Sequence, residues 1–228
     1  MKAMILAAGR GERMRPLTDT CPKPLLQAGG KPLIVWHLER LKQAGFNEVL
    51  INHAHLGDLI EAALGDGRAF GLNIHYSPEP PGALETAGGI KHALHWLGED
   101  PFLVLNGDIF CNWPLHCART ALSDDDLAHL VLVPNPPQHP DGDFILADKR
   151  VYSSGNAARL TFAGIGIYRP QLFSQLIERT PAKLAPLLVA AAEANCVSGE
   201  LHTGIWTDVG TPERLAALNL SLLTNPLP

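Results

Sequence analysis

The apolar positions in the first half of the chain alternate between two patterns. Short continuous apolar runs, such as residues 3–7 and 102–105, are typical of strands covered on both faces of a sheet. Between such runs, apolar residues recur at helical spacing, and Pro32, Gly45 and Gly65 bound two of these stretches. The expected elements are strands over residues 3–7, 48–52, 72–77 and 102–105, and helices over residues 32–44, 56–64 and 85–97.

This alternation of strands and helices predicts the α/β class, with a Rossmann-like, doubly wound sheet and right-handed crossovers. In such sheets, ligands bind outside the carboxyl ends of the strands. Four residues fall at or just beyond an expected strand end, namely Gly9, Asn52, Ser77 and Asp108. We therefore expect the functional site at that edge of the sheet.

The second half of the chain is less regular. Strands are expected over residues 127–133, 145–151 and 160–168, with antiparallel pairing that makes the sheet mixed, and residues 134–140 form a proline-rich loop. Helices are expected over residues 170–178 and 183–194, and a last one begins at residues 211–213 and continues to 223. We predict a single domain over residues 1–228, divided into halves at 1–112 and 113–228.

The composition narrows the class of protein. The chain of 228 residues is 46% hydrophobic and 18% charged, which is typical of a globular domain. Its net charge of −5 disfavours a nucleic-acid partner. We expect no signal peptide and no membrane span. The four cysteines lack metal-ligand spacing, so we expect free thiols and a cytoplasmic location.

Glycines and basic residues are concentrated directly after the first expected strand. Gly9 and Gly11 allow the backbone to approach a ligand, and Arg13 and Lys23 add positive charge, which together indicate a polyphosphate site. The P-loop pattern is absent, and Met14 stands where the dinucleotide fingerprint requires its third glycine. Proline at position 16 also argues against a helix here, so we expect a long ordered loop.

The complete motif, Gly9-Arg10-Gly11-Glu12-Arg13-Met14-Arg15-Pro16-Leu17-Thr18 followed by Pro22-Lys23-Pro24, resembles the signature of the sugar-1-phosphate nucleotidyltransferases. The resemblance implies the GT-A-like nucleotidyltransferase fold, and at this length we expect no β-helix extension. It also implies a nucleotide-binding first half and a sugar-phosphate-binding second half. By resemblance, Arg13 holds the leaving β- and γ-phosphates, and Lys23 contacts the α-phosphate and the sugar phosphate.

Two aspartates are candidate magnesium ligands. Asp108 follows the strand over residues 102–105, where a carboxylate can reach an ion that bridges phosphates, although Asn106-Gly107 also suits a simple turn. Asp208 precedes the last expected helix, and on its own it suits a helix cap. The family resemblance of Trp206-Thr207-Asp208-Val209-Gly210-Thr211-Pro212 implies that Asp208 pairs with Asp108 around Mg²⁺.

The resemblance further implies two sets of binding residues. The nucleotide contacts would come from Ala8, Gly9, Gly11, Glu12, Arg13, Lys23, Glu79 and Gly82. The sugar-phosphate contacts would come from Asn106, Asp141, Gly142, Asp143 and Gly164. The Asp141-Gly142-Asp143 run suits a solvent-exposed turn equally well. The E-K-P motif of thymidylyl- and glucose-specific relatives is absent.

The sequence Leu84-Glu85-Thr86-Ala87 bears on the nucleotide. Guanylyltransferases of this family usually have L-G-T-A there, whereas the L-E-T-[AG]-G-G variant in a short chain resembles uridylyltransferases acting on N-acetylmuramate α-1-phosphate. That resemblance implies UTP and a sugar 1-phosphate as substrates, in cell-wall sugar recycling. Guanylyl transfer to mannose 1-phosphate and a non-catalytic nucleotide-sugar sensor remain alternatives. We expect a monomer or a small homo-oligomer.

Several charged residues can be interpreted in two ways from the sequence. Arg10 and Arg15 are equally well explained as phosphate contacts and as solvated loop charges. His53 and His55 have H-x-H spacing but no third zinc-type ligand nearby, which favours loop or packing roles. Lys149-Arg150 is better explained by a solvated hairpin tip than by recognition of a substrate carboxylate.

Overall fold

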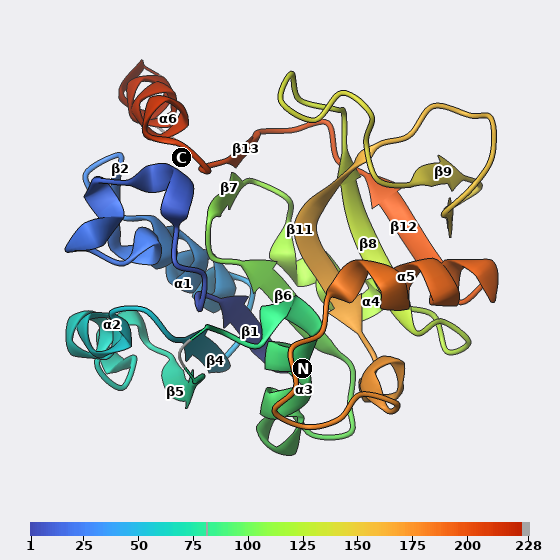
Figure 1. Cartoon of the computed structure of the whole chain (residues 1–228), viewed down its shortest axis with the longest axis horizontal. Coiled ribbons are helices and arrows are strands. Elements are labelled where there is room, and N and C mark those ends of the chain that lie inside the picture. The colour runs from blue at the N-terminus through green and yellow to red at the C-terminus, as the bar shows by residue number, and fades with distance from the viewer. Residues whose placement is uncertain (81, 225–228) are drawn as a thin grey trace.

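A nine-stranded mixed sheet forms the centre of the molecule in a computed structural model that describes residues 1–80 and 82–224. The strand order is β5-β4-β1-β6-β11-β8-β12-β10-β9 (Figure 1). The strands of the sheet are β1 (Ala3–Leu6), β4 (Glu48–His53), β5 (Asn73–Pro78), β6 (Phe102–Asn106), β8 (Ala128–Val133), β9 (Ile145–Ala147), β10 (Arg150–Tyr152), β11 (Thr161–Tyr168) and β12 (Val197–Leu201). The last four residues of the predicted domain, 225–228, lie outside the described residues.

The first half of the sheet is parallel, as predicted. β1 lies between β4 and β6, and β5 pairs with β4, all in parallel. Leu6 at the end of β1 is opposite Asn52 on one side and Asn106 on the other. The carboxyl ends of the strands therefore meet at one edge, where the sequence places its polar and glycine residues.

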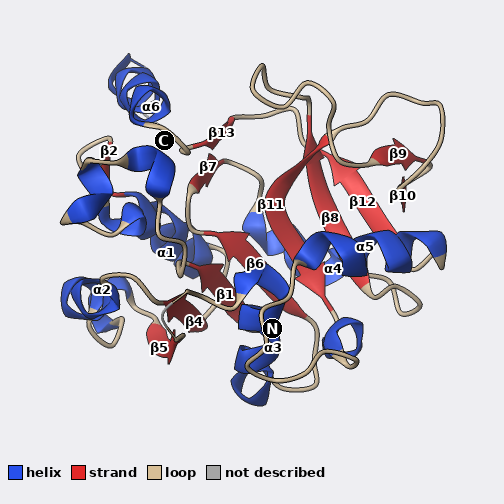
Figure 2. Ribbon diagram, in the orientation of Figure 1, coloured by secondary structure: helices blue, strands red, loops and turns tan. Residues whose placement is uncertain are grey.

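Helices cover both faces of this sheet (Figure 2). The α-helices are α1 (Leu33–Gln43), α2 (Gly57–Leu64), α3 (Glu85–Leu97), α4 (Ala118–Ala121), α5 (Leu184–Glu193) and α6 (Pro212–Thr224). Alternate side chains of each strand enter different cores: Ile5 packs with α1, α2 and α4, whereas Met4 packs with α3 and α5. Both side chains are fully buried.

The second half differs from the prediction in several places. The expected strand over 145–151 is two strands, β9 and β10, joined by a tight turn in which Asp148 and Lys149 have positive φ. The expected helix over 170–178 is only a 3₁₀ turn, Pro170–Phe173, because the chain then runs to α3, where the Ala182 carbonyl accepts the first-turn N–H groups of Ala87 and Gly88. β12, which was not predicted, pairs in parallel with β8.

Two short ribbons lie outside the main sheet. β2 (Gln27–Ala28) pairs with β3 (Lys31–Pro32), and β7 (Ile109–Cys111) pairs with β13 (Trp206–Asp208). α6 contacts β2 and β13, and Asn219 on α6 accepts the backbone N–H of Gly29. The C-terminal helix therefore packs beside the N-terminal loop, as Figure 1 shows. Among the described residues, no helix has the length and apolar character needed to cross a bilayer.

The buried histidine of α1 makes stability depend on pH. His37 is 2% exposed, and burial, together with the charge of Arg40, lowers its pKa to about 4. The imidazole of His37 binds a proton more readily in the unfolded chain than in the folded protein. The contribution of neutral His37 to the free energy of unfolding is therefore complete above pH 6.5 and is lost as pH falls towards 4. Chemical denaturation should show a loss of roughly 3 kcal/mol from this residue across that range.

The test variant is His37→Leu. Its matched control is His116→Gln, because His116 is an exposed histidine. The His37 variant should show a flatter pH dependence between 6.5 and 4, whereas the His116 variant should follow the parent protein. Equal pH dependence of His37→Leu and the parent protein would contradict the assignment.

Candidate active site

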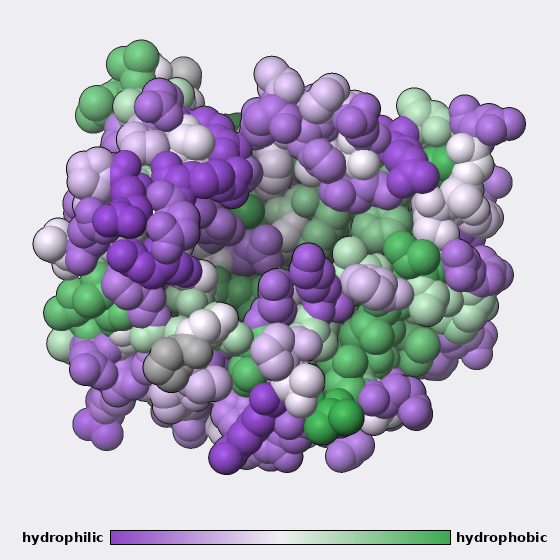
Figure 3. Space-filling model, in the orientation of Figure 1, coloured by the Kyte–Doolittle hydropathy of each residue, from purple (hydrophilic) through white to green (hydrophobic). Residues whose placement is uncertain are grey.

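Two adjoining hollows lie at the carboxyl ends of the parallel strands. The first has a volume of about 350 Å³ and the second about 260 Å³, and they share Asn106 and Asp108. The first is lined mainly by residues 6–9, 23–24, 82–83, 85–86 and 106–108, with Asn52 and Glu79. The second is lined mainly by residues from β11, β13 and the 134–140 loop, with Arg13. Figure 3 shows this face of the molecule hollowed near its middle.

The loop after β1 is ordered without being an α-helix, as predicted. Three 3₁₀ turns, Glu12–Met14, Leu17–Asp19 and Lys23–Leu25, carry it across the strand ends. Met14 is fully buried and anchors it in a small core beneath α6. A Cβ on Gly11, where φ is +70°, would lie 3.0 Å from Thr18, so the close packing of this turn favours glycine.

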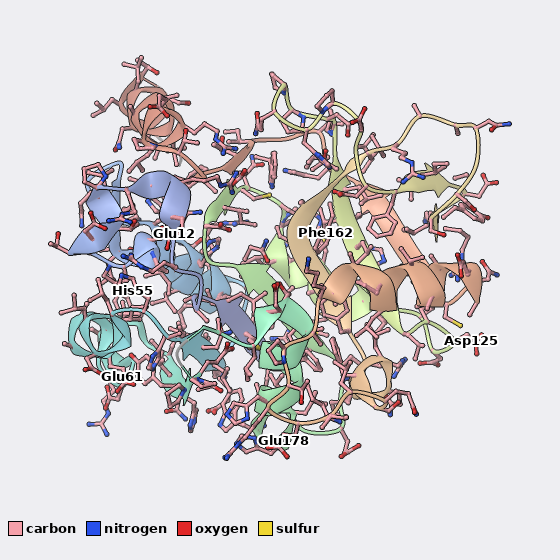
Figure 4. All side chains as sticks on the ribbon, viewed as in Figure 1. Glu12, His55, Glu61, Asp125, Phe162 and Glu178 are labelled. Carbon is pink, nitrogen blue, oxygen red and sulfur yellow. The ribbon has the colours of Figure 1, made fainter. Side chains whose placement is uncertain are left out.

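The predicted nucleotide residues of this loop occupy different positions. Ala8 and Gly9 line the first hollow, and a Cβ built on Gly9 would meet nothing within 4 Å, which leaves its backbone accessible. Gly11 and Glu12 do not line either hollow. The Glu12 side chain is 65% exposed and pairs with Arg10 and Arg15. Figure 4 shows Glu12 and Phe162 on opposite sides of the hollowed region.

Lys23 and Asp108 form an ion pair at the boundary between the hollows. The Lys23 ammonium donates to Asp108 Oδ2 at 2.6 Å, and the lysine side chain is only 9% exposed. Lys23 comes from the loop, whereas Asp108 follows β6, so residues 85 positions apart meet here. The turn at Asp108 does not join a β-hairpin, because β7 pairs with β13 and β6 pairs with β11 on that side.

The β7–β13 ribbon places the second predicted carboxylate beside the first. Asp208 is opposite Ile109, and the Val209 N–H donates to the Asp108 carbonyl at 2.9 Å. Asp108, Asp208 and Arg13 all line the second hollow. Arg214 of α6 donates to Asp208 Oδ2 at 2.5 Å. The sequence analysis did not identify Arg214; its place two residues into α6, after the aspartate motif, was the available signal.

A buried hydrogen-bond chain ties the strand ends together. Asn52 accepts the Ala7 N–H at 2.8 Å and donates to Glu79 Oε1 at 2.6 Å, and Glu79 Oε2 accepts the Leu84 N–H at 2.7 Å. Asn52 and Glu79 are 2% and 8% exposed. Because buried polar groups need partners, this chain fixes the wall of the first hollow formed by β1, β4 and β5.

The segment before α3 has an uncommon backbone. Gly82, Ala83 and Glu85 all have positive φ, at 100°, 56° and 58°, and all three line the first hollow. Left-handed conformations are unfavourable for alanine and glutamate, and such strain is concentrated at ligand sites. Gly82 was predicted from sequence as a nucleotide contact, and the structure places it in the wall of the first hollow.

The predicted sugar residues are divided by the structure. Asn106 and Gly164 line the second hollow and touch one another, since a Cβ on Gly164 would lie 2.7 Å from the Asn106 amide nitrogen. Asp141, Gly142 and Asp143 lie outside both linings. Asp143 instead pairs with His139 at 3.0 Å and accepts the Phe162 N–H at 2.7 Å. Several residues that line the second hollow were not predicted as site residues, among them Gln138, His139 and Trp206.

The arginine and histidine side chains whose roles were left open by the sequence contact other protein groups in the structure. Arg10 contacts Asp19, the Thr18 carbonyl and His55, and Arg15 pairs with Asp19. His53 pairs with Glu61 at 2.7 Å, and the described residues hold no group of three His, Cys, Asp or Glu side chains suited to a metal. The packing or loop roles of His53 and His55 agree with this arrangement.

The Lys149–Arg150 tip lies at the far edge of the sheet. Arg150 in β10 pairs with the buried Asp126 at 2.6 Å, and Lys149 is exposed in the β9–β10 turn. Neither residue lines either hollow. This part of the chain therefore forms a hairpin tip whose arginine stabilises the fold.

The chemistry of the donor set suits magnesium. Mg²⁺ is usually bound by one or two carboxylates together with substrate phosphates and water, and not by a complete cage of protein ligands. Asp108 and Asp208 supply two carboxylates facing one hollow, and Arg13 and Lys23 bring positive charge for phosphates next to them. The arrangement can therefore bind a polyphosphate with a divalent ion between it and the protein.

Comparison with known proteins identifies the family. The family model described as nucleotidyl transferase matches residues 2–225. An N-acetylmuramate alpha-1-phosphate uridylyltransferase from Neisseria meningitidis serogroup B is 60% identical over 220 residues, covering 94% of this chain and 95% of that protein. A protein of the same description from Caulobacter vibrioides is 38% identical over 231 residues, covering 94% of each.

A solved structure supports the fold alone. The crystal structure of a protein from Bacillus anthracis, in complex with a sucrose, aligns with a TM-score of 0.85 at 23% identity and covers 100% of this chain and 96% of that one. The family and the fold expected from the loop motif are thus confirmed. This chain belongs to the nucleotidyl transferase family and has the mixed α/β sheet of its nucleotidyltransferase fold.

Proposed function

We propose that this protein transfers UMP from UTP to N-acetylmuramate α-1-phosphate, giving UDP-N-acetylmuramate and pyrophosphate in cell-wall sugar recycling. The observation that carries the proposal is the 60% identity to the Neisseria uridylyltransferase across 95% of that protein's length. The site geometry supports it, because Arg13, Lys23, Asp108 and Asp208 surround two adjoining hollows of a size suited to small molecules.

The first hollow is the proposed UTP site. Ala8, Gly9 and Gly82 bring backbone close to the ligand, and Glu79 shapes the wall through Asn52 and Leu84. Gly11 and Glu12 act in this proposal through the turn that carries Arg13. The small residues at the end of β1 leave room for phosphates over the strand edge, as in other α/β nucleotide sites.

The second hollow is the proposed sugar-phosphate site. Asn106 and Gly164 form its floor between β6 and β11. Asp143 orients His139 at its rim, and Asp141 and Gly142 shape the same loop. Because Asn106 and Asp108 also line the first hollow, a sugar phosphate in the second would face the nucleotide phosphates directly.

The proposed reaction requires positioning and charge stabilisation. The phosphate oxygen of the sugar 1-phosphate is already anionic, so no general base is needed when it attacks the α-phosphorus. The new O–P bond forms as the bond to pyrophosphate breaks, in line. Lys23 would hold the α-phosphate and the incoming sugar phosphate, and Arg13 would hold the leaving β- and γ-phosphates.

Magnesium completes the proposed site. Asp108 and Asp208 would hold Mg²⁺, which when bound neutralises negative charge on the phosphates as pyrophosphate departs. The carboxylates themselves fix its place relative to Lys23 and Arg13, because both aspartates belong to one backbone ribbon.

The proposed setting follows from the substrates and from the charge of the chain. We place the enzyme in the cytoplasm, where nucleoside triphosphates are available, as a monomer or small homo-oligomer with small-molecule substrates. The net charge of −5 gives it no general attraction for nucleic acid or anionic lipid.

Substitution of either residue of the central ion pair should strongly reduce turnover. Lys23→Met and Asp108→Asn should each lower kcat/KM by about two to three orders of magnitude, because each removes a charge that acts on the reacting phosphates. Lys149→Met is the matched control, since Lys149 is exposed at a distant hairpin tip, and it should keep parental activity. Near-normal turnover of either site variant would overturn the scheme.

The substrate assignment is tested by pyrophosphate release. The full chain is assayed with Mg²⁺ and each pairing of UTP, GTP, dTTP or CTP with the 1-phosphates of N-acetylmuramate, N-acetylglucosamine, glucose and mannose. UTP with N-acetylmuramate α-1-phosphate should give the highest kcat/KM. Fastest release with GTP and mannose 1-phosphate would replace the proposal with guanylyl transfer, and release with no pair would favour a nucleotide-sugar sensor.

A further inference from the structure

We infer that Arg214 is the resident counter-ion of Asp208 and keeps divalent cations out of the site until a nucleotide arrives. The inference rests on the proposed use of Asp108 and Asp208 as metal ligands. Arg214 is thus a positioning residue that sets the order of binding. The metal binds together with the triphosphate and not before it.

The local backbone is shaped to bring Arg214 to the carboxylate. α6 begins at Pro212, and the Arg214 N–H donates to the Thr211 hydroxyl. Its guanidinium then turns back across Gly210, where a Cβ would lie 2.4 Å from Arg214 Nη2 and 3.0 Å from Asp208 Oδ1. A side chain at position 210 would displace the arginine, so glycine there makes the contact possible.

The resulting pair is close and partly shielded from water. Arg214 Nη1 lies 2.5 Å from Asp208 Oδ2, with the two side chains 20% and 25% exposed. Charge-assisted contacts of this kind are stronger than neutral hydrogen bonds and are less screened than surface pairs. Arg214 therefore occupies one carboxylate oxygen of Asp208, while Oδ1 lies on the side of Gly210.

The second carboxylate is neutralised in the same way. Asp108 Oδ2 accepts from Lys23 at 2.6 Å. Arg13 lines the same hollow as both aspartates and has no ion pair within residues 1–80 and 82–224. The two carboxylates, their direct partners Lys23 and Arg214, and Arg13 together carry two negative and three positive charges, so this group of side chains repels a bare divalent cation.

A nucleotide reverses this balance. Its triphosphate brings several negative charges, which attract Arg13 and Lys23 and release Asp108. The metal then finds phosphate oxygens and carboxylates together, the ligand set that Mg²⁺ prefers. Arg214 remains on Asp208 and presents its free oxygen, as outer partners of metal ligands commonly do.

The test is a titration of the nucleotide-free full chain with Mn²⁺. The electron paramagnetic resonance signal of free Mn²⁺ measures how much of the ion is bound. Arg214→Met should bind Mn²⁺ about tenfold more tightly than the parent protein, because it removes a positive charge that repels the cation at Asp208. Arg214→Lys, which keeps the charge, should match the parent. Equal or weaker binding by Arg214→Met would show that the arginine only supports the fold, and would overturn the inference.

A second measurement does not depend on the variants folding. The parent protein is titrated with Mn²⁺ with and without a non-hydrolysable UTP analogue, after subtracting binding by the analogue alone. Protein-bound Mn²⁺ should rise sharply with the analogue, and equal binding without it would overturn the inference. No sugar phosphate is present, so a failure of the proposed uridylyl transfer would appear in the pyrophosphate assay and not in this titration.

Discussion

The ion pair between Lys23 and Asp108 is the contact on which the site depends. It joins a loop of 3₁₀ turns to the end of the central strand β6, at the boundary between the two hollows. The lysine is almost fully buried, and an unpaired ammonium at that depth would be costly. The loop is therefore held against the strand ends by the same charge that the proposed reaction uses on the phosphates.

The position of this pair follows from the topology of the sheet. Parallel pairing of β4, β1 and β6 brings three carboxyl ends to one edge, and the Asn52–Glu79 chain fixes the wall beside them. The β7–β13 ribbon then adds a carboxylate from the far end of the chain. Most of the site is thus scaffolded by backbone pairing, which suits catalysis by positioning.

The parallel half was predictable because each of its elements is specified locally. The apolar run of β6 and the helical spacing of α3 appear in the sequence at the residues where the structure has them. The second half depends on distant contacts. The chain after Phe173 leaves helical geometry to reach α3, and β12 is specified by its neighbour β8 more than by its own five residues. Arg214 was missed for the same reason, since its partner is set by a turn at Gly210 and not by a helical repeat.

Direct transfer between two anions held together is the central claim, and isotope exchange tests it most directly. Labelled pyrophosphate is incubated with the full chain, Mg²⁺ and UTP, with and without N-acetylmuramate α-1-phosphate, and label entering UTP is measured. Label should enter UTP only when the sugar phosphate is present, because the reverse reaction needs the UDP-sugar. Exchange with UTP alone would show a uridylyl-enzyme intermediate and would contradict the account.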